Sequence, residues 1–235
     1  YEKKGRIARV TINRPGRMNA LHPPANAELH HAFTDFREDS EVWIAIITGV
    51  GDRAFSAGND LIYMTEHGEG EDGTSEEVPF GGITSGFTCW KPIIAAINGY
   101  ALGGGLEIAL ACDIIIAADH AEFGLPEPRV GLVATGGGLH RLPRQVPIKV
   151  AMGMILTGKR ITAQEAYRIG LVNEVVPLSG LMSATGRWAN QILKGDEGTL
   201  CLSMGISMKL CACTAACTWQ HFGSPRSSQL AMKHS

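Results

Sequence analysis

Two carboxylates and a glycine triplet are the residues of this chain whose types and spacing could do chemistry. The triplet runs from Gly103 to Gly105, Glu107 follows it, and Glu127 stands further on between two prolines. Bare main-chain N–H groups can donate to a negatively charged oxygen, and two carboxyl groups can act as general acid and general base. The apolar run from Leu106 to Cys112 predicts a buried helix whose N-terminus lies at the glycines. Developing negative charge would be stabilised there, beside Glu107.

The same residues also have a purely structural interpretation. A glutamate in a first helical turn is favoured by the helix dipole alone, and glycines occur wherever backbones pack closely. Three more glycine-rich stretches favour the chemical interpretation, because each can present backbone to a ligand; they lie at Gly49 to Gly51, Ser56 to Asp60, and Gly136 to Gly138.

The elements that must position these groups alternate between strands and helices. Continuous apolar runs predict strands buried on both faces at 42–48, 93–97 and 114–118. Periodicity and turn residues predict further strands at 6–13 and 171–176, and helices at 23–39, 148–156, 162–169 and 180–193. This alternation predicts an α/β fold with largely parallel strand pairing. The polar segment 66–77 is expected to be a solvated loop, with a cover over the site as the alternative.

Composition excludes several classes of protein. The 235 residues are 45% hydrophobic and 19% charged, as in a soluble globular protein. A net charge of −2 gives no electrostatic footprint for nucleic acid or an anionic membrane, and the longest uncharged stretch, 92–106, is too short to span a bilayer. Cys89 and Cys112 are typical of core thiols in a reducing compartment. We therefore expect the cytoplasm, or an organelle matrix if a leader has been removed.

Four motifs occur in an order that resembles the crotonase superfamily, the enoyl-CoA hydratase/isomerase group; they span Phe55 to Leu61, Lys91 to Glu107, Ala111 to Asp113, and Phe123 to Glu127. The resemblance implies a crotonase-like spiral of ββα repeats in residues 1–194 that carries the active site. It also implies that residues 195–235 form a C-terminal helical segment for assembly into trimers or pairs of trimers. Within the family, the segment ending at Glu127 looks most like the carnitinyl-CoA (crotonobetainyl-CoA) hydratase branch.

Carried over by motif position, the resemblance implies specific roles. The main-chain N–H groups of Asn59 and Gly104 would form an oxyanion hole for a thioester carbonyl, and Glu107 and Glu127 would be the catalytic pair. Glu107 would activate water while Glu127 exchanges a proton with the α-carbon. No metal and no cofactor are expected apart from the coenzyme A (CoA) that the substrate carries. The residues expected at the substrate and its CoA portion are Met18, Ala20, Ala57, Asp60, Leu61, Ile62 and Gly103.

The expected activity is an enoyl-CoA hydratase of fatty acid metabolism, which adds water reversibly, in syn fashion, to an α,β-unsaturated acyl-CoA thioester. Alternatives on the same scaffold are an isomerase that works with Glu127 alone, a carnitinyl-CoA dehydratase, thioester hydrolysis and decarboxylation. RNA binding is a remote alternative. A dinucleotide-binding fingerprint fails, because Ala54 stands where a third glycine is needed.

Three segments depart from the family pattern. Ile62 stands where many hydratases carry a lysine that contacts CoA phosphate, and the segment 131–136, which is expected to border the acyl pocket, lacks a common Pro-Gly pair. The tail does not align with the family's terminal helices. Its cysteines and one histidine match no common zinc pattern, so a zinc site there is only a minor alternative; these residues are Cys211, Cys213, Cys217 and His221.

Overall fold

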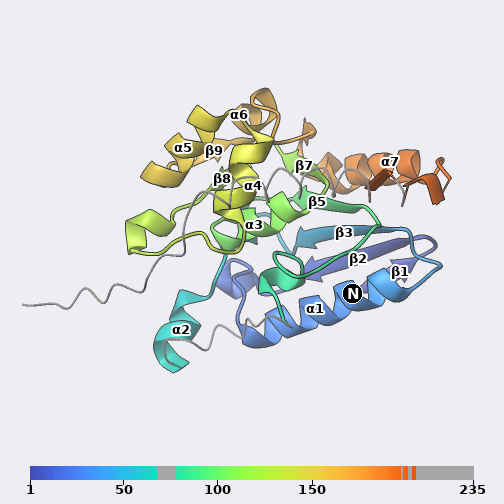
Figure 1. Ribbon diagram of the computed structural model, residues 1–235, viewed down its shortest axis with the longest axis horizontal. Coiled ribbons are helices and arrows are strands. Elements are labelled where there is room, and N and C mark those ends of the chain that lie inside the picture. Colours follow the sequence, from blue (N-terminus) through green and yellow to red (C-terminus); the bar gives the residue numbers. More distant parts are fainter. Residues whose placement is uncertain (68–77, 197, 201–202, 205–235) are drawn as a thin grey trace, which may run out of the picture.

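The computed structural model describes residues 1–67, 78–196, 198–200 and 203–204, and a six-stranded sheet forms its centre (Figure 1). The strand order is β1-β2-β3-β5-β7-β10, in which β1 pairs antiparallel with β2 and every other neighbouring pair is parallel. The strands are β1 (Glu2–Lys4), β2 (Ile7–Ile12), β3 (Ile44–Gly49), β5 (Ile93–Ile97), β7 (Ile114–Ala118) and β10 (Glu174–Val176).

A second, four-stranded sheet of short strands has the order β4-β6-β8-β9. Three of its strands each follow a strand of the large sheet, so the chain repeats the order large-sheet strand, small-sheet strand, helix. This is the ββα repeat that the family resemblance implies. The elements that follow β3, β5 and β7 are β4 (Ala54–Ser56) with α2 (Leu61–His67), β6 (Tyr100–Leu102) with α3 (Gly104–Ala111), and β8 (Glu122–Gly124) with the 3-10 helix η3 (Glu127–Val130) and α4 (Gly138–Gln145).

The large sheet is covered on both faces, because its central strands are apolar throughout. All residues of β3 are buried, and the side chains from Ile44 to Ile47 alternate between two hydrophobic clusters. One cluster includes Phe33 and Phe36 of helix α1 (Pro23–Glu38), and the other includes Leu181 and Ala184 of helix α7 (Leu181–Ile192). The two helices therefore cover opposite faces of the sheet.

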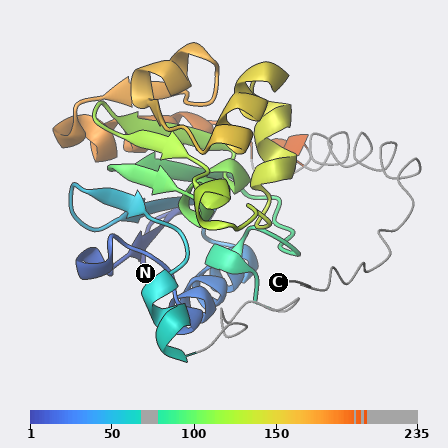
Figure 2. The same cartoon turned by 90° about the vertical axis from the view of Figure 1, so that its left-hand side faces the viewer.

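The C-terminal part of the described chain adds further helices beside the small sheet. Figure 2 shows them at the end of the molecule opposite to α1. These elements are α5 (Ile148–Thr157), β9 (Ile161–Thr162), α6 (Ala163–Arg168) and the 3-10 helix η4 (Leu178–Gly180); two more 3-10 helices lie earlier in the chain, η1 (Pro15–Arg17) and η2 (Phe80–Gly82). No helix among the described residues is long and apolar enough to cross a membrane.

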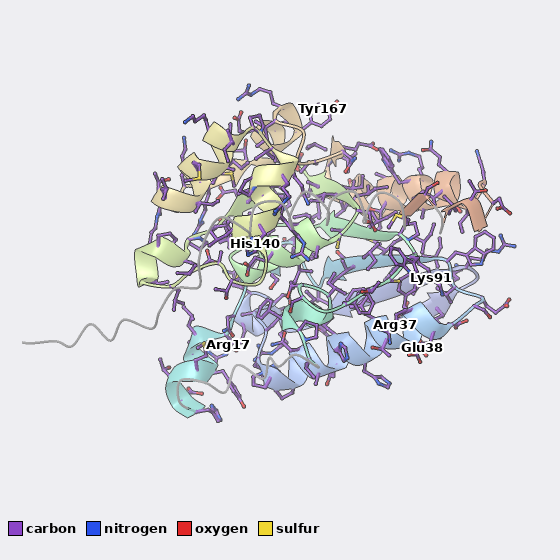
Figure 3. All side chains as sticks on the ribbon, in the orientation of Figure 1. Arg17, Arg37, Glu38, Lys91, His140 and Tyr167 are labelled. Carbon is purple, nitrogen blue, oxygen red and sulfur yellow. The ribbon has the colours of Figure 1, made fainter. Side chains whose placement is uncertain are left out.

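Lys91 connects the first helix to the loop before β5. Its Nζ donates to the main-chain oxygens of Phe36 and Asp39, at 3.0 and 2.6 Å, and Figure 3 shows it close to the last turn of α1. A positive charge at a helix C-terminus is stabilising, so this contact fixes α1 against the sheet.

The main corrections concern boundaries. The predicted loop at 66–77 begins inside α2, which extends to His67, and its residues from 68 on lie outside the described part. The strand predicted at 171–176 is shorter and begins at Glu174. The cysteines and histidine of the tail, and with them the alternative zinc site, lie outside the described residues.

Candidate active site

The glycine triplet forms the turn between strand β6 and helix α3. Gly103 has φ 54° and ψ −126°, a backbone conformation that favours glycine, and Gly104 is the first residue of the helix. A Cβ atom on Gly105 would overlap the main-chain oxygen of Ser56, so α3 packs directly against the end of β4. The first N–H groups of a helix have no acceptor within it, so the amide of Gly104 is available to a ligand.

The segment around Gly58 lies against this turn, backbone to backbone. A Cβ atom on Gly58, whose φ is 91°, would stand 2.8 Å from the nitrogen of Gly104 and 2.9 Å from the oxygen of Leu102. Asn59 comes next in the chain, and within the described residues its main-chain N–H donates to no other group. The amides of Asn59 and Gly104 therefore belong to two segments in direct contact.

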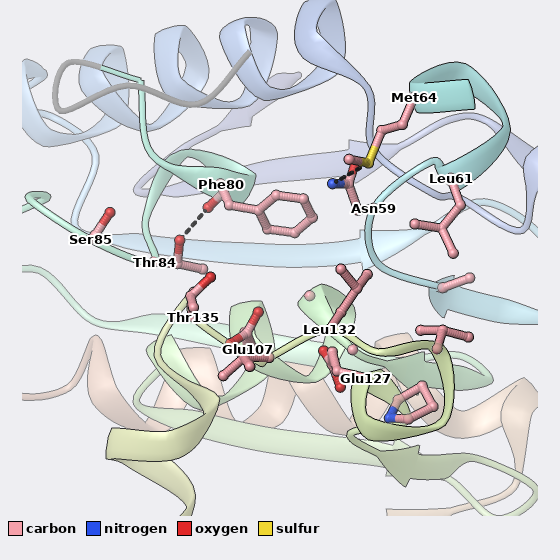
Figure 4. Close-up of a pocket in the computed structure, with 17 residues that line it drawn as sticks. Asn59, Leu61, Met64, Phe80, Thr84, Ser85, Glu107, Glu127, Leu132 and Thr135 are labelled. Carbon is pink, nitrogen blue, oxygen red and sulfur yellow. Dashed lines mark hydrogen bonds between the residues drawn. The ribbon is translucent and has the colours of Figure 1, made fainter. Parts of the chain in front are cut away.

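Asn59 and Gly104 both line one pocket of about 420 Å³ (Figure 4). The figure shows Glu107 and Glu127 on one wall, with Phe80 and Asn59 across the pocket from them. Apolar side chains make up much of the rest, as in a site that excludes water from a reacting group. The lining residues are Ala57, Asn59, Leu61, Met64, Phe80, Thr84, Ser85, Gly103, Gly104, Glu107, Pro126, Glu127, Val130, Leu132, Val133, Thr135 and Gly136.

Glu107 projects from the first turn of α3 and is only 5% exposed. Its Oε1 accepts a hydrogen bond of 2.8 Å from the main-chain N–H of Gly138. Burial, together with the charge of Glu127, raises the pKa of Glu107 from 4.5 to about 7, although the Gly138 N–H and the Arg141 guanidinium act in the opposite direction. A carboxyl group with a pKa near neutrality is suited to proton transfer.

Glu127 is the first residue of η3, directly after Pro126, and is half-buried. Its Oε1 lies against Gly103, 3.0 Å from the position that a Cβ atom would take there. Its Oε2 is buried and has no hydrogen-bond partner in the described part of the chain. Burial raises the pKa of Glu127 as well. An unpartnered buried carboxyl oxygen is a group that a substrate could satisfy.

The pocket brings seven of the residues predicted for the site together and leaves four out. Met18, Ala20, Asp60 and Ile62 do not line it. The side chain of Asp60 is buried and pairs with Arg14 at 2.9 Å, whereas Ile62 is 51% exposed on α2. Their contact with CoA stays a prediction. The seven residues in the pocket are Ala57, Asn59, Leu61, Gly103, Gly104, Glu107 and Glu127.

Sequence reasoning missed the wall formed by Met64, Phe80 and Thr84, which reach the pocket from α2 and from the segment around η2. Their sequence neighbours carry no pattern that points to a ligand. The segment 131–136, in contrast, was expected to border the acyl pocket, and four of its residues do line the pocket. The other glycine stretches have different roles, because Gly138 holds Glu107 and Gly49 packs against the main chain of β4.

Known proteins match the sequence of this chain. A family model described as "Enoyl-CoA hydratase/isomerase" matches residues 2–206. The carnitinyl-CoA dehydratase of Citrobacter koseri is 43% identical over 193 residues, which cover 82% of this chain and 73% of that protein. The carnitinyl-CoA dehydratase of Salmonella arizonae is 44% identical over 192 residues, with the same coverage of 82% and 73%.

Solved structures agree with the fold that the resemblance implied. An enoyl-CoA hydratase from Mycobacterium tuberculosis superposes with a TM-score of 0.83 at 38% identity, covering 88% of this chain and 80% of that one. A carnitinyl-CoA dehydratase from Mycobacterium avium gives the same TM-score, identity and coverage. The expected α/β fold of ββα repeats is thereby confirmed.

Proposed function

Because the chain belongs to the enoyl-CoA hydratase/isomerase family, we propose that it adds water reversibly to an α,β-unsaturated acyl-CoA thioester. The observation that supports this proposal is that Glu107, Glu127, Asn59 and Gly104 all line one pocket. That arrangement offers donors for an oxyanion together with two groups for proton transfer, which are the two requirements of the reaction.

The two amides would polarise the thioester carbonyl. Attack of water on the β-carbon moves the electrons of the double bond onto the carbonyl oxygen and forms an enolate. Two fixed N–H donors stabilise that charge without reorganisation, and removal of one such donor typically lowers the rate by ~10² to 10³. The start of helix α3 adds its partial positive charge at Gly104.

The two glutamates would move the protons. In hydration, ionised Glu107 takes a proton from water as the oxygen bonds to the β-carbon, and protonated Glu127 gives a proton to the α-carbon as the enolate collapses. In dehydration, ionised Glu127 takes the α-proton, and protonated Glu107 gives its proton to the departing hydroxyl group. Two acids in one pocket titrate as a pair, so each direction starts from a different distribution of one proton.

A second candidate is the reverse direction, dehydration of carnitinyl-CoA. The relatives from Citrobacter koseri and Salmonella arizonae, which are 43% and 44% identical, carry the name carnitinyl-CoA dehydratase. In addition, Glu107 is the more deeply buried of the two carboxyl groups, and burial favours the neutral form that dehydration needs at this position. Crotonobetainyl-CoA is therefore a substrate to test beside crotonyl-CoA.

Further features of the family would complete the site. We propose that the CoA portion lies along Met18 and Ala20 and past Ala57 to Ile62, and that no other cofactor is needed. Contact between these segments supports this path, because the N–H of Ala57 donates to the oxygen of Met18 at 3.0 Å. Assembly into a trimer or a pair of trimers is part of the proposal, and light scattering on the purified protein measures it.

The test follows the conjugated thioester absorbance with crotonyl-CoA, with longer enoyl-CoAs and with crotonobetainyl-CoA. We expect loss of absorbance with at least one of them, and its return when the corresponding hydroxyacyl-CoA is supplied. Faster turnover of crotonobetainyl-CoA than of crotonyl-CoA would select the carnitinyl-CoA reaction. Folded protein that turns over none of these thioesters would overturn the proposal.

A further inference from the structure

A turn of three glycines wraps the Glu107 carboxylate. Gly138, the first residue of α4, donates its N–H to Oε1 at 2.8 Å. A Cβ atom on Gly136 would stand 2.6 Å from Oε2, and one on Gly138 would stand 3.1 Å from Oε1. The carboxylate therefore packs closely against the N-terminus of α4, and a side chain on either glycine would require it to shift.

Arg141 holds this turn from its other side. Its Nη1 donates to the main-chain oxygen of Gly136 at 3.3 Å, and its own N–H donates to the oxygen of Gly137 at 2.8 Å. A Cβ atom on Gly137, whose φ is 112°, would overlap the guanidinium, so the arginine packs directly on the turn's backbone. Arg141 forms no salt bridge with a carboxylate among the described residues, which leaves its charge available to the site.

Two charged groups act on Glu107, from two different elements. Glu127 on η3 favours the neutral form of Glu107, and burial acts in the same direction. Arg141 on α4 favours the ionised form. Since a half-buried guanidinium is less screened by water than an exposed one, its charge has a larger effect on a neighbouring carboxyl group.

We propose that Arg141 is a positioning residue, which fixes the turn from Gly136 to Gly138 around the Glu107 carboxylate and supplies a positive charge that favours the ionised form of this carboxylate. The role of Glu107 in proton transfer rests on the proposed function, whereas its contact with the turn does not. Arg141 itself does not line the pocket, so it acts on the reaction only through Glu107.

The first test is the pH dependence of kcat for hydration in Arg141→Met and Arg141→Lys. Loss of the charge in Arg141→Met should raise the pKa of Glu107, so the acidic limb should move up by about one pH unit or more. KM should change little, because Arg141 does not reach the pocket. Arg141→Lys keeps a charge but not the planar guanidinium, so it should lower kcat with a smaller movement of the limb. Arg144→Met, an exposed arginine on the same helix, is the matched control and should leave the limb in place.

The second test needs no activity. Chemical unfolding from pH 4 to pH 9 compares Glu107→Gln with its parent, once in the wild-type background and once in Arg141→Met or, if that variant does not fold, in Arg141→Gln. We expect the stability gained by Glu107→Gln to begin at the same pH in both backgrounds, but to keep rising to a higher pH and reach a larger final value when the arginine is replaced. Identical pH dependence in both backgrounds would overturn the inference. A shift in a protein that hydrates no thioester would support the inference and reject the proposed function.

Discussion

The two glutamates of the pocket are held in different ways. Glu107 lies on a buried helix, is 5% exposed and accepts a hydrogen bond from Gly138 at the start of another helix. Glu127 lies on a single turn of 3-10 helix that begins after Pro126, is half-buried, and has one oxygen without a partner among the described residues. The protein therefore supplies a hydrogen-bond donor to the Glu107 carboxyl group, whereas one oxygen of the Glu127 carboxyl group has no partner in the described part of the chain.

This difference shows how one residue type can serve two roles in one pocket. A carboxylate with a fixed donor keeps one orientation and can direct a water molecule. A carboxyl group with an oxygen that lacks a hydrogen-bond partner can exchange a proton with a nearby carbon of a substrate. The surroundings therefore separate the two acids in orientation and in proton affinity, as in other enzymes that use paired carboxyl groups.

The largest expected effect comes from removing each of the two proposed proton-transfer groups in turn. Glu107→Gln and Glu127→Gln should each lower kcat for hydration by ~10² to 10⁴, because glutamine cannot exchange a proton. Glutamine keeps an oxygen that can accept from Gly138, so at position 107 the loss reports the proton and not the orientation. The measurement is the rate of loss of the conjugated thioester absorbance.

Glu28→Gln on the exposed side of α1 is the control for this pair and should retain full activity. Hydration that survives in Glu107→Gln would remove the need for two acids. If double-bond migration persists in that variant and disappears in Glu127→Gln, the protein is an isomerase that works with one glutamate.

A smaller effect is expected on stability. The folded pKa of Glu107, about 7, exceeds its ordinary value of 4.5, so the native state binds more protons than the unfolded state between these values. Stability should therefore fall as the pH rises from 4.5 through 7. At about 1.4 kcal/mol for each pKa unit, Glu107→Gln should gain up to about 3 kcal/mol above pH 7 and little below pH 4.5.

Urea unfolding of the wild type and Glu107→Gln across this range measures the gain. Glu127→Gln is the comparison within the pocket and should gain less, because Glu127 is less buried. An equal gain at pH 4 and pH 8 would show that the Glu107 pKa is ordinary in the folded protein, and the contrast between the two acids would disappear.

The smallest effect comes from disturbing the orientation of the fixed acid. In Gly136→Ala the new Cβ would stand 2.6 Å from Oε2 of Glu107, so the carboxylate must move. We expect kcat to fall about 10- to 100-fold with little change in KM, because misplacement of a reacting group affects the transition state more than binding. Steady-state kinetics measures both constants.

Gly153→Ala on α5 is the matched control, since nothing lies within 4 Å of its Cβ position. It should leave kcat unchanged. If Gly136→Ala is equally active, the carboxylate is not held in the single orientation that distinguishes it from Glu127.

Long apolar elements could be predicted from the sequence, and short ones could not. The runs at Ile93–Ile97 and Ile114–Ala118 are strands β5 and β7 with the predicted bounds, because strands buried on both faces are apolar throughout. The three-residue strands of the small sheet are too short to show a period. Helix α4 was not predicted from the sequence, because it contains Pro143 and begins in a glycine turn, and both features locally disfavour a helix.

The residues of the site also differ in whether the sequence could predict them. Asn59, Gly104 and Glu107 lie within motifs, so their positions could be predicted, and the structure places them in one pocket. Phe80 and Thr84 reach the pocket only because the chain folds back over α3, and no local pattern records that contact. The contact of Arg141 with the glycine turn likewise depends on tertiary packing.

The close contact at Gly58 sets the distance between two backbone segments of the pocket. The Cα of Gly58 faces the main chain of Leu102 and Gly104 with no atom between them, so close backbone packing sets the spacing of the two amides that we propose to bind the carbonyl. Substitutions of side chains elsewhere can change the shape of the pocket without changing this spacing. A methyl group on Gly58 would push the two backbone segments apart and increase the spacing of the amides.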